Sequence, residues 1–448
     1  MIQKLKNIGK EKNISSLLTN VVIAFLGLLS FMLLTRQLSK ELFGDWVLFI
    51  TLATFVDLLR FGLTRTSVVR LLAGADKDRF KNLLGSSYRI NLILLGLIGL
   101  FCWAVLGVLN FSNVSINQGY QLFLTWYPLL ALCNLGWNTA SALFQAQQNF
   151  NRMMHVRFAN IGLFVVFLIG NGLWFNLGLL EIVLVNLAVN LISSLWCTIK
   201  KWDGLVFLKH ADKNIEKELI NFGKYSMGTL IGSSLLKSAD TLIIGLSPVL
   251  GSAGIAMYAI PLKLTDLLGI PLRSFTMTAY PRMSKKAIAG DLDGVRKIFY
   301  AYSGAITLLF IPVAIFCFVF AEYLILILGG DAYADSLPLL TLVFRVFTVY
   351  TLLLPIDRFT GVLLDSINRP KLNLYKVIFM TIANVLIDVL AVFVFESLVM
   401  VALGTVLFTL LGIFLGFYFL RKEIQIQSKQ ILPEGIFFFK NLNTYIGR

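Results

Sequence analysis

The sequence predicts an all-α integral membrane protein with twelve transmembrane helices. Of the 448 residues, 57% are hydrophobic and only 14% are charged, whereas soluble domains carry about 25% charged residues. The apolar residues form runs close to the roughly 20 residues that a helix needs to cross the hydrocarbon core of a bilayer. The basic residues gather in the loops between these runs. Together, these observations exclude a soluble globular fold.

The apolar runs divide the chain into two halves of six spans each. The expected spans are 15–36, 42–64, 88–109, 121–145, 157–177, 179–199, 222–246, 252–275, 298–320, 336–361, 373–395 and 398–420. This pattern predicts an N-terminal lobe over 1–199, a cytoplasmic linker over 200–221, a C-terminal lobe over 222–420 and a cytoplasmic tail over 421–448. The Asp-Leu-Leu motif that begins at Asp57 in the second span recurs at Asp266 in the eighth. Such a recurrence favours a parallel repeat with a site between the two halves.

The loops are sorted by charge. One side receives the basic N-terminus, the linker and the tail, whereas the later loops of the other side carry only acids, such as Glu181 and Glu322. Cytoplasmic loops collect Lys and Arg, so both termini are expected in the cytoplasm. The net charge of +15 is therefore attributed to topology and to contact with anionic lipid, and no nucleic-acid partner is expected.

The cysteines indicate neither disulfides nor a metal centre. All four lie inside apolar runs, and none forms a C-x-x-C pair. Buried free cysteines of this kind behave as small apolar residues. We therefore expect no disulfide framework, no metal and no cofactor.

Charged residues nevertheless occur inside two adjacent predicted spans. The stretch from 232 to 273 contains Lys237, Asp240, Lys263 and Asp266. A charged side chain near the centre of a bilayer costs roughly 2.5–3.5 kcal/mol on insertion scales, so these groups must face a partner or a wet cavity. The pattern predicts a transporter with a charge-lined cavity. The alternative is that the i,i+3 pairs, which also include Asp57 with Arg60, neutralise each other and serve only insertion and packing.

Several segments resemble a known family. The run TFVDLLRFGLTRTSVVRLLAG (54–74), the run SADTLIIG (238–245) and the run YPRMSKKAIAGD (280–291) are similar to the oligosaccharide flippases, the Wzx-type polysaccharide transporters. That family shares a superfamily with the multidrug and toxin extruders. The resemblance implies two six-helix bundles in a V around a central cavity. It also implies transfer of an undecaprenyl-pyrophosphate-linked oligosaccharide across the cytoplasmic membrane for O-antigen or capsule synthesis, with a polysaccharide polymerase as a neighbouring partner.

A pyrophosphate and its sugars would need cations and hydrogen-bonding groups inside the membrane. Lys263 and Arg345 are expected near the midplane, at about 1.5 Å of rise per residue, and Lys237 somewhat nearer the outer side. Arg345 has no acidic residue at i±3 or i±4, and its forked guanidinium suits phosphate. For the sugars, the fourth span supplies the carboxamides Asn134 and Asn138.

Ion coupling requires a carboxylate that binds and releases a cation. The candidates are Asp57, Asp240 and Asp388, each within a predicted span. The first span contains no acid, although extruders of the superfamily often have one there. This departure leaves the coupling ion open.

Other charges are expected nearer the cytoplasmic surface. Arg60, Arg65 and Asp357 are explained by snorkelling, in which the stem is buried and the charged end reaches water. Lys376 is assigned to the basic cytoplasmic loop that begins at Arg369.

Three other classes of protein are alternatives to the flippase. An ion-coupled multidrug extruder, or a transporter of the major facilitator type, would share the plan of six plus six spans. A membrane enzyme would need a catalytic cluster, and the sequence shows no paired His/Asp or Ser/His/Asp constellation. A structural scaffold would have no need for Lys and Arg at the midplane.

Overall fold

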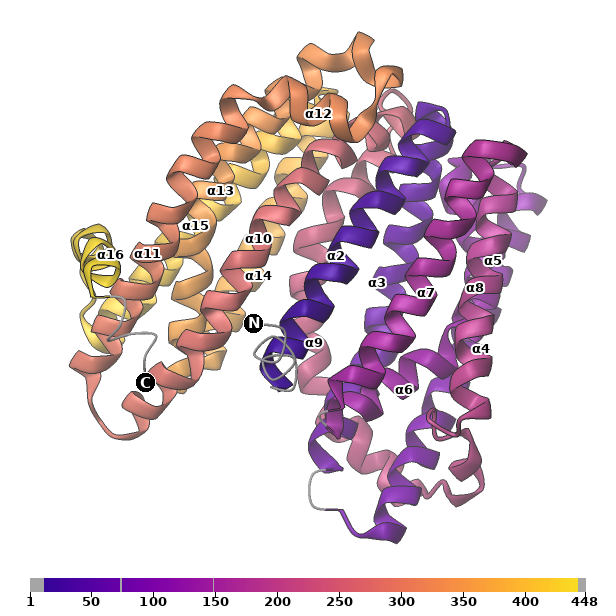
Figure 1. The fold of residues 1–448 in the computed structure, drawn as a ribbon, viewed down its shortest axis with the longest axis horizontal. Coiled ribbons are helices and arrows are strands. Elements are labelled where there is room, and N and C mark those ends of the chain that lie inside the picture. The colour runs from indigo at the N-terminus through magenta and orange to yellow at the C-terminus, as the bar shows by residue number, and fades with distance from the viewer. Residues whose placement is uncertain (1–11, 73–74, 148, 442–448) are drawn as a thin grey trace, which may run out of the picture. The chain divides into compact units, whose positions relative to one another are not determined.

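A computed structural model describes residues 12–72, 75–147 and 149–441 of the chain. The described part is built from helices (Figure 1) and contains no strand. Its contacts divide it into two compact units, Met1–Ser234 and Leu235–Arg448, which are treated separately below. The basic start of the chain, the end of the resembling run at 73–74 and the last seven residues of the tail lie outside the described residues.

The first unit contains the elements that enclose the cavity described below. They are α2 (Lys12–Gln37), α3 (Lys40–Leu71), α4 (Lys77–Phe111), α5 (Gln118–Cys133), α6 (Leu135–Ala146), α7 (Phe150–Gly170), η1 (Asn171–Phe175), α8 (Leu179–Ile199), η2 (Leu205–His210) and the start of α9 (Lys213–Gly245). The boundary between the units, after Ser234, falls inside α9. Helix α9 begins at Lys213, so the second half of the predicted linker is helical.

The predicted fourth span is not one helix, because a side chain of another helix interrupts it. In an unbroken α-helix, the amide of Trp137 would bond to the carbonyl of Cys133. Here the hydroxyl of Ser194 on α8 accepts from the amide of Trp137 at 3.1 Å and donates to the carbonyl of Cys133 at 2.5 Å. A side chain inserted into the helical ladder bends the helix, and α5 and α6 meet at Asn134.

The second unit consists of the end of α9 and the helices that follow it. These are α10 (Gly251–Ile288), α11 (Leu292–Val319), α12 (Ala321–Gly329), η3 (Asp331–Ser336), α13 (Leu337–Ser366), α14 (Pro370–Phe393), α15 (Leu398–Ile424), η4 (Ser428–Gln430) and α16 (Ile431–Lys440). Its main apolar core lies between α10, α11, α13, α15 and α16, around buried aromatic residues that include Phe299, Phe310 and Phe359.

The helices confirm the predicted membrane class. Within the described residues, nine helices are long and apolar enough to span a bilayer. The three remaining predicted spans coincide with α2, with α5 and α6 together, and with α9. The chain is therefore a multi-pass membrane protein.

Part of the predicted tail is packed against the second unit. Helix α16 lies against α11, where Gly304 meets Gly435 so closely that a Cβ atom on Gly304 would lie 1.9 Å from the carbonyl oxygen of Ile431. Only glycine fits at position 304, because any side chain there would clash with backbone atoms of α16.

We expect Gly304→Ala to destabilise the protein by at least the 1–3 kcal/mol that is typical of overpacking. The substitution forces α16 away from α11 and uncovers the aromatic core beneath it. Thermal unfolding in detergent, followed by circular dichroism of the helices, measures the loss. Gly269→Ala is the matched control, because a Cβ atom at that position of α10 meets nothing within 4 Å. Equal unfolding temperatures for the two variants would contradict the assigned packing.

Candidate functional site

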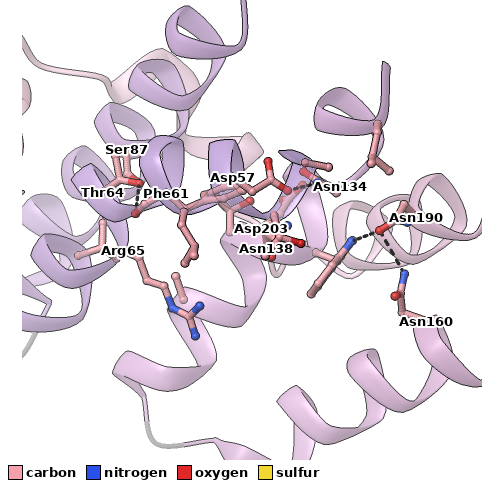
Figure 2. Close-up of a pocket in the computed structure, with 18 of the residues that line it drawn as sticks. Asp57, Phe61, Thr64, Arg65, Ser87, Asn134, Asn138, Asn160, Asn190 and Asp203 are labelled. Atoms are coloured by element: carbon pink, nitrogen blue, oxygen red, sulfur yellow. Dashed lines mark hydrogen bonds between the residues drawn. The ribbon is translucent and has the colours of Figure 1, made fainter. Parts of the chain in front are cut away.

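The first unit encloses a cavity of about 410 Å³. We call it the asparagine cavity, because five asparagine side chains line it (Figure 2). One lies at the junction between α5 and α6, one on α6, one on α7 and two on α8. They are Asn134, Asn138, Asn160, Asn186 and Asn190. Thr54, Thr64, Ser87 and Thr139 add hydroxyl groups, and Asp57, Arg65 and Asp203 add charges. A carboxamide offers two donors and a carbonyl acceptor, so the wall suits a neutral ligand that is rich in hydroxyl groups.

A network around Asp57 holds one end of this cavity in place. The carboxylate accepts from Nη2 of Arg60 at 2.9 Å, from the Tyr127 hydroxyl at 3.0 Å and from Nδ2 of Asn134 at 2.6 Å. Arg60 also donates to Oδ1 of Asn134 at 2.6 Å and to the carbonyl of Ala131 at 2.8 Å. The snorkelling interpretation of Arg60 is therefore wrong: its side chain is fully buried because a carboxylate, an amide and a carbonyl replace water around it.

A second network orients the amides on the opposite wall. Oδ1 of Asn190 accepts from the indole Nε1 of Trp137 at 2.9 Å and from Asn160 at 3.4 Å. Asn160 also donates to the Ser193 hydroxyl at 3.1 Å. Figure 2 shows the bond between Asn160 and Asn190. Amides fixed by neighbours of this kind present their remaining donors and acceptors in a defined geometry.

The second unit contains two buried carboxylates that share one amide. Nδ2 of Asn384 donates to Asp240 at 3.1 Å and to Asp388 at 3.0 Å. The hydroxyl of Tyr258 donates to Asp240 through a short bond, and Thr405 lies 3.5 Å from the same oxygen. Asp388 and Asn384 are 0% exposed and Asp240 is 5% exposed. Among the described residues, no ion pair neutralises either carboxylate.

Two oxygens of this carboxylate cluster lack a donor. In the described part of the chain, Oδ1 of Asn384 and Oδ1 of Asp388 are buried and accept no hydrogen bond. The neighbouring position of α15 is Gly404, whose hypothetical Cβ atom would lie 3.7 Å from Oδ1 of Asp388. An unpaired buried carboxylate is very costly, so this arrangement calls for a proton or a cation.

A buried ion pair lies nearer the start of α14. Lys376 contacts a carboxylate oxygen of Asp357 at 2.7 Å, and it donates to the Asp357 carbonyl at 2.7 Å and to the Thr360 hydroxyl at 2.9 Å. The loop assignment of Lys376 and the snorkelling of Asp357 are therefore wrong, because both side chains are buried. Gly412 on α15 makes room for the pair, since a Cβ atom there would lie 2.6 Å from Asp357.

The three predicted cations all lie outside the asparagine cavity. Lys237 is exposed on α9, Lys263 is half-buried on α10 and Arg345 is half-buried on α13. Nε of Arg345 donates to the carbonyl of Phe318 at 3.3 Å, and its guanidinium stacks on the ring of that residue. Phe318 is the penultimate residue of α11, so the structure places Arg345 beside the end of a neighbouring helix.

The structure thus brings some candidates together. Asn134 bonds to Asp57, and Asn138 lines the same cavity. Asp240 and Asp388 meet through Asn384. Asn384 was not predicted as a site residue, although its spacing of four residues from Asp388 places both on one face of a helix and could have indicated it. The asparagines of α7 and α8 were not predicted either, and no local signal points to them.

Comparisons with known proteins agree with this architecture. A family model described as polysaccharide biosynthesis protein matches residues 10–287, and the MatE model matches residues 226–390. No curated protein sequence matches the chain.

Solved structures share the fold at low identity. An inward-facing multidrug resistance MATE family transporter of the MOP superfamily aligns with a TM-score of 0.76 at 17% identity, over 90% of this chain and 94% of that one. The lipid II flippase MurJ, in an inward closed conformation, aligns with a TM-score of 0.73 at 13% identity, over 94% and 89%. A MOP superfamily transporter from Pyrococcus furiosus aligns with a TM-score of 0.62 at 17% identity, over 92% and 94%. The fold is therefore that of the MOP superfamily transporters.

Proposed function

Because the chain belongs to the polysaccharide biosynthesis protein family, we propose that it is a flippase for an undecaprenyl-pyrophosphate-linked oligosaccharide. It moves this lipid from the inner to the outer leaflet of the cytoplasmic membrane for the synthesis of a surface polysaccharide such as O-antigen or capsule. The basic loops support cytoplasmic termini. A polysaccharide polymerase that receives the product is the partner this role implies.

The asparagine cavity is the observation that carries this proposal. Its lining combines five carboxamides with hydroxyl groups, and such groups pair with the hydroxyls of a sugar as both donors and acceptors. A cavity built for a lipophilic cation would be expected to place a free carboxylate among its aromatic and apolar walls. The asparagine cavity also has apolar lining residues, such as Phe61 and Trp137, but the carboxylate of Asp57 is already paired with Arg60.

We further propose that Asp240 and Asp388 couple transport to a monovalent cation, either a proton or Na⁺. Two buried carboxylates and two oxygens without donors support this role, because hard cations in proteins are bound by oxygen ligands. Asp57 is less suited, since Arg60 already neutralises its charge.

The sugar-binding role of the asparagine cavity can be tested with reconstituted protein. We expect Asn138→Ala combined with Asn160→Ala to slow the movement of a fluorescent lipid-linked oligosaccharide across proteoliposomes by about tenfold or more, since each lost hydrogen bond costs about 1 kcal/mol. Accessibility of the glycan to an external lectin measures the rate. Asn110→Ala is the matched control, because Asn110 is exposed near the end of α4 and does not line the cavity.

The same proteoliposomes distinguish the proposed flippase from an ion-coupled multidrug extruder. Wild-type proteoliposomes that leave the lipid-linked glycan in place, but exchange a cationic dye for protons or Na⁺, would identify an extruder and refute the proposal.

A further inference from the structure

We propose that Trp137 is the platform on which a sugar ring of the substrate stacks, and that Ser194 is the positioning residue that holds this platform in the asparagine cavity. The inference rests on the proposed function and deepens it, because it assigns the apolar face of the sugar to one side chain. Neither residue was predicted as a site residue from the sequence.

Trp137 supplies what the carboxamides of the cavity lack. A pyranose ring presents hydroxyl groups along its edge and C–H groups on its faces, so a sugar site needs polar groups together with a flat apolar surface. The asparagines serve the edge. Among the described lining residues, only Phe61 and Trp137 are aromatic. The guanidinium of Arg60 already lies over the Phe61 ring, 4.3 Å from its centroid, so the indole is the better platform.

Carboxamides surround this indole. Asn138 follows Trp137 in the chain and lines the cavity. Oδ1 of Asn190, on α8, accepts from the indole Nε1 at 2.9 Å, and Asn160 donates to the same oxygen at 3.4 Å. A sugar that lies on the indole therefore has hydrogen-bonding side chains along its edge.

Helix α8 holds both ends of Trp137. The indole Nε1 is bonded to Asn190, and the main-chain amide donates to the Ser194 hydroxyl at 3.1 Å. Asn190 is itself fixed, because its Nδ2 donates to the Asn186 carbonyl, one turn earlier, at 2.8 Å. A side chain that is ordered before binding loses little conformational entropy when the ligand arrives. Trp137 is therefore ordered in advance for stacking.

Ser194 determines where this indole lies. Its hydroxyl separates the Trp137 amide from the Cys133 carbonyl, to which it donates at 2.5 Å, so α6 departs from the line of α5 at Asn134. Gly136 permits the close approach, because a Cβ atom there would lie 3.0 Å from Cβ of Ser194 and 3.2 Å from its carbonyl oxygen. Ser194 is buried and is not among the described residues that line the cavity, so it acts on the substrate only through the residues it holds.

Packing alone does not explain Trp137. An apolar cluster packs against it, formed by Ala140, Phe144, Met153, Val156 and Cys197. The side chain nevertheless stays half-buried and borders the cavity. An aromatic ring that only filled the core would be covered completely, as Phe144 is at 1% exposure.

The experiment measures binding to the purified full-length protein in detergent with two probes. One is the lipid-linked oligosaccharide extracted from cells that lack this protein, in which an untransported substrate accumulates. The other is undecaprenyl pyrophosphate, which carries no sugar. The variants are Trp137→Leu, Trp137→Phe and Ser194→Ala. Ser141→Ala is the matched control, because this buried hydroxyl on α6 donates only within its own helix, to the Trp137 carbonyl, a bond that a helix does not need.

We expect Trp137→Leu to weaken binding of the lipid-linked oligosaccharide about thirtyfold, the effect of truncating a tryptophan at the centre of an interface, and Trp137→Phe to weaken it less. Ser194→Ala should weaken it about fivefold, the effect of one lost hydrogen bond, while Ser141→Ala leaves it unchanged. Undecaprenyl pyrophosphate binding should be unchanged in every variant, because this lipid has no sugar to stack. Its retention also shows that the variants are folded.

Fluorescence supplies a readout that a loss of stability alone would not change. The glycan released from its lipid by mild acid should alter the tryptophan emission of the wild type. This change should vanish in Trp137→Phe, although the other tryptophans of the chain remain, and it should diminish in Ser194→Ala.

Wild-type affinity for the lipid-linked oligosaccharide in Trp137→Leu would overturn the stacking assignment. An equal loss for both probes would also overturn it, because Trp137 would then be a structural residue. If Ser194→Ala behaves like Ser141→Ala, the positioning role is overturned. Each of these results leaves the flippase function intact, provided that the wild type moves the glycan. If no lipid-linked oligosaccharide accumulates in cells without the protein and the wild type moves none, the proposed function itself is refuted.

Discussion

Lys376→Met is expected to lower the free energy of unfolding by about 3–5 kcal/mol, the usual cost of removing one partner of a buried ion pair. The substitution leaves the buried carboxylate of Asp357 without its cation, which lies 2.7 Å away in the wild type. Gly412 brings the backbone of α15 close to the same carboxylate, which stays buried when the ammonium group is lost. Unfolding of the detergent-solubilised protein by denaturant measures the change.

The double variant Lys376→Met with Asp357→Leu tests whether the lost stability comes from the uncompensated charge of Asp357. Replacing both charges by apolar groups is often neutral or stabilising, so we expect it to recover most of the lost stability. Lys371→Met is the matched control, because Lys371 is exposed in the first turn of the same helix. A single Lys376→Met variant as stable as this control would show that the pair contributes nothing to folding.

Asp388→Asn is expected to abolish the dependence of transport on the coupling cation. The change keeps the size of the side chain but removes the negative charge and one acceptor oxygen, and coupling between sites in proteins typically changes affinity by about 5- to 150-fold. Glycan transport in proteoliposomes with and without a proton or Na⁺ gradient measures the effect. The variant should transport slowly and equally under both conditions.

Cation binding can also be detected without transport. If the cluster binds Na⁺, saturating salt stabilises the wild type by about 2.7 kcal/mol at a hundredfold excess over the dissociation constant, and Asp388→Asn loses this gain. If it binds a proton, the stabilisation follows pH instead. Asp331→Asn is the control, because Asp331 is exposed in η3. Gradient-dependent transport that persists in Asp388→Asn would exclude this carboxylate from coupling.

The helices could be predicted from the sequence because their cause is local. An apolar run that enters lipid must satisfy its backbone hydrogen bonds within the segment, and a helix does so. The twelve expected spans therefore correspond to helices in the structure. The break at Asn134 could not be predicted, since it depends on Ser194 from another helix. The sequence near residue 134 contains no sign of that hydroxyl.

The candidate site was predicted less completely, and the errors share one cause. A charge within an apolar run shows that a partner is needed but not where the partner lies. Asp357 was assigned to snorkelling because its partner Lys376 lies on another helix. Asp57, the ionic partner of Arg60, is only three residues away, but the groups that complete the surroundings of Arg60 are not. Asn134, which completes the surroundings of Arg60, is 74 residues away.

From the sequence we could predict that this chain spans a membrane, where its apolar spans lie and which carboxylates need a partner. Those properties depend on the hydropathy of consecutive residues and on the cost of burying charge. The tertiary structure alone decided which groups meet: Asn384 reaches Asp240 across 144 residues, and Thr405 approaches it across 165. Hydrogen bonds act over only a few ångströms. The packing of whole helices therefore decides which distant residues come close enough to form them.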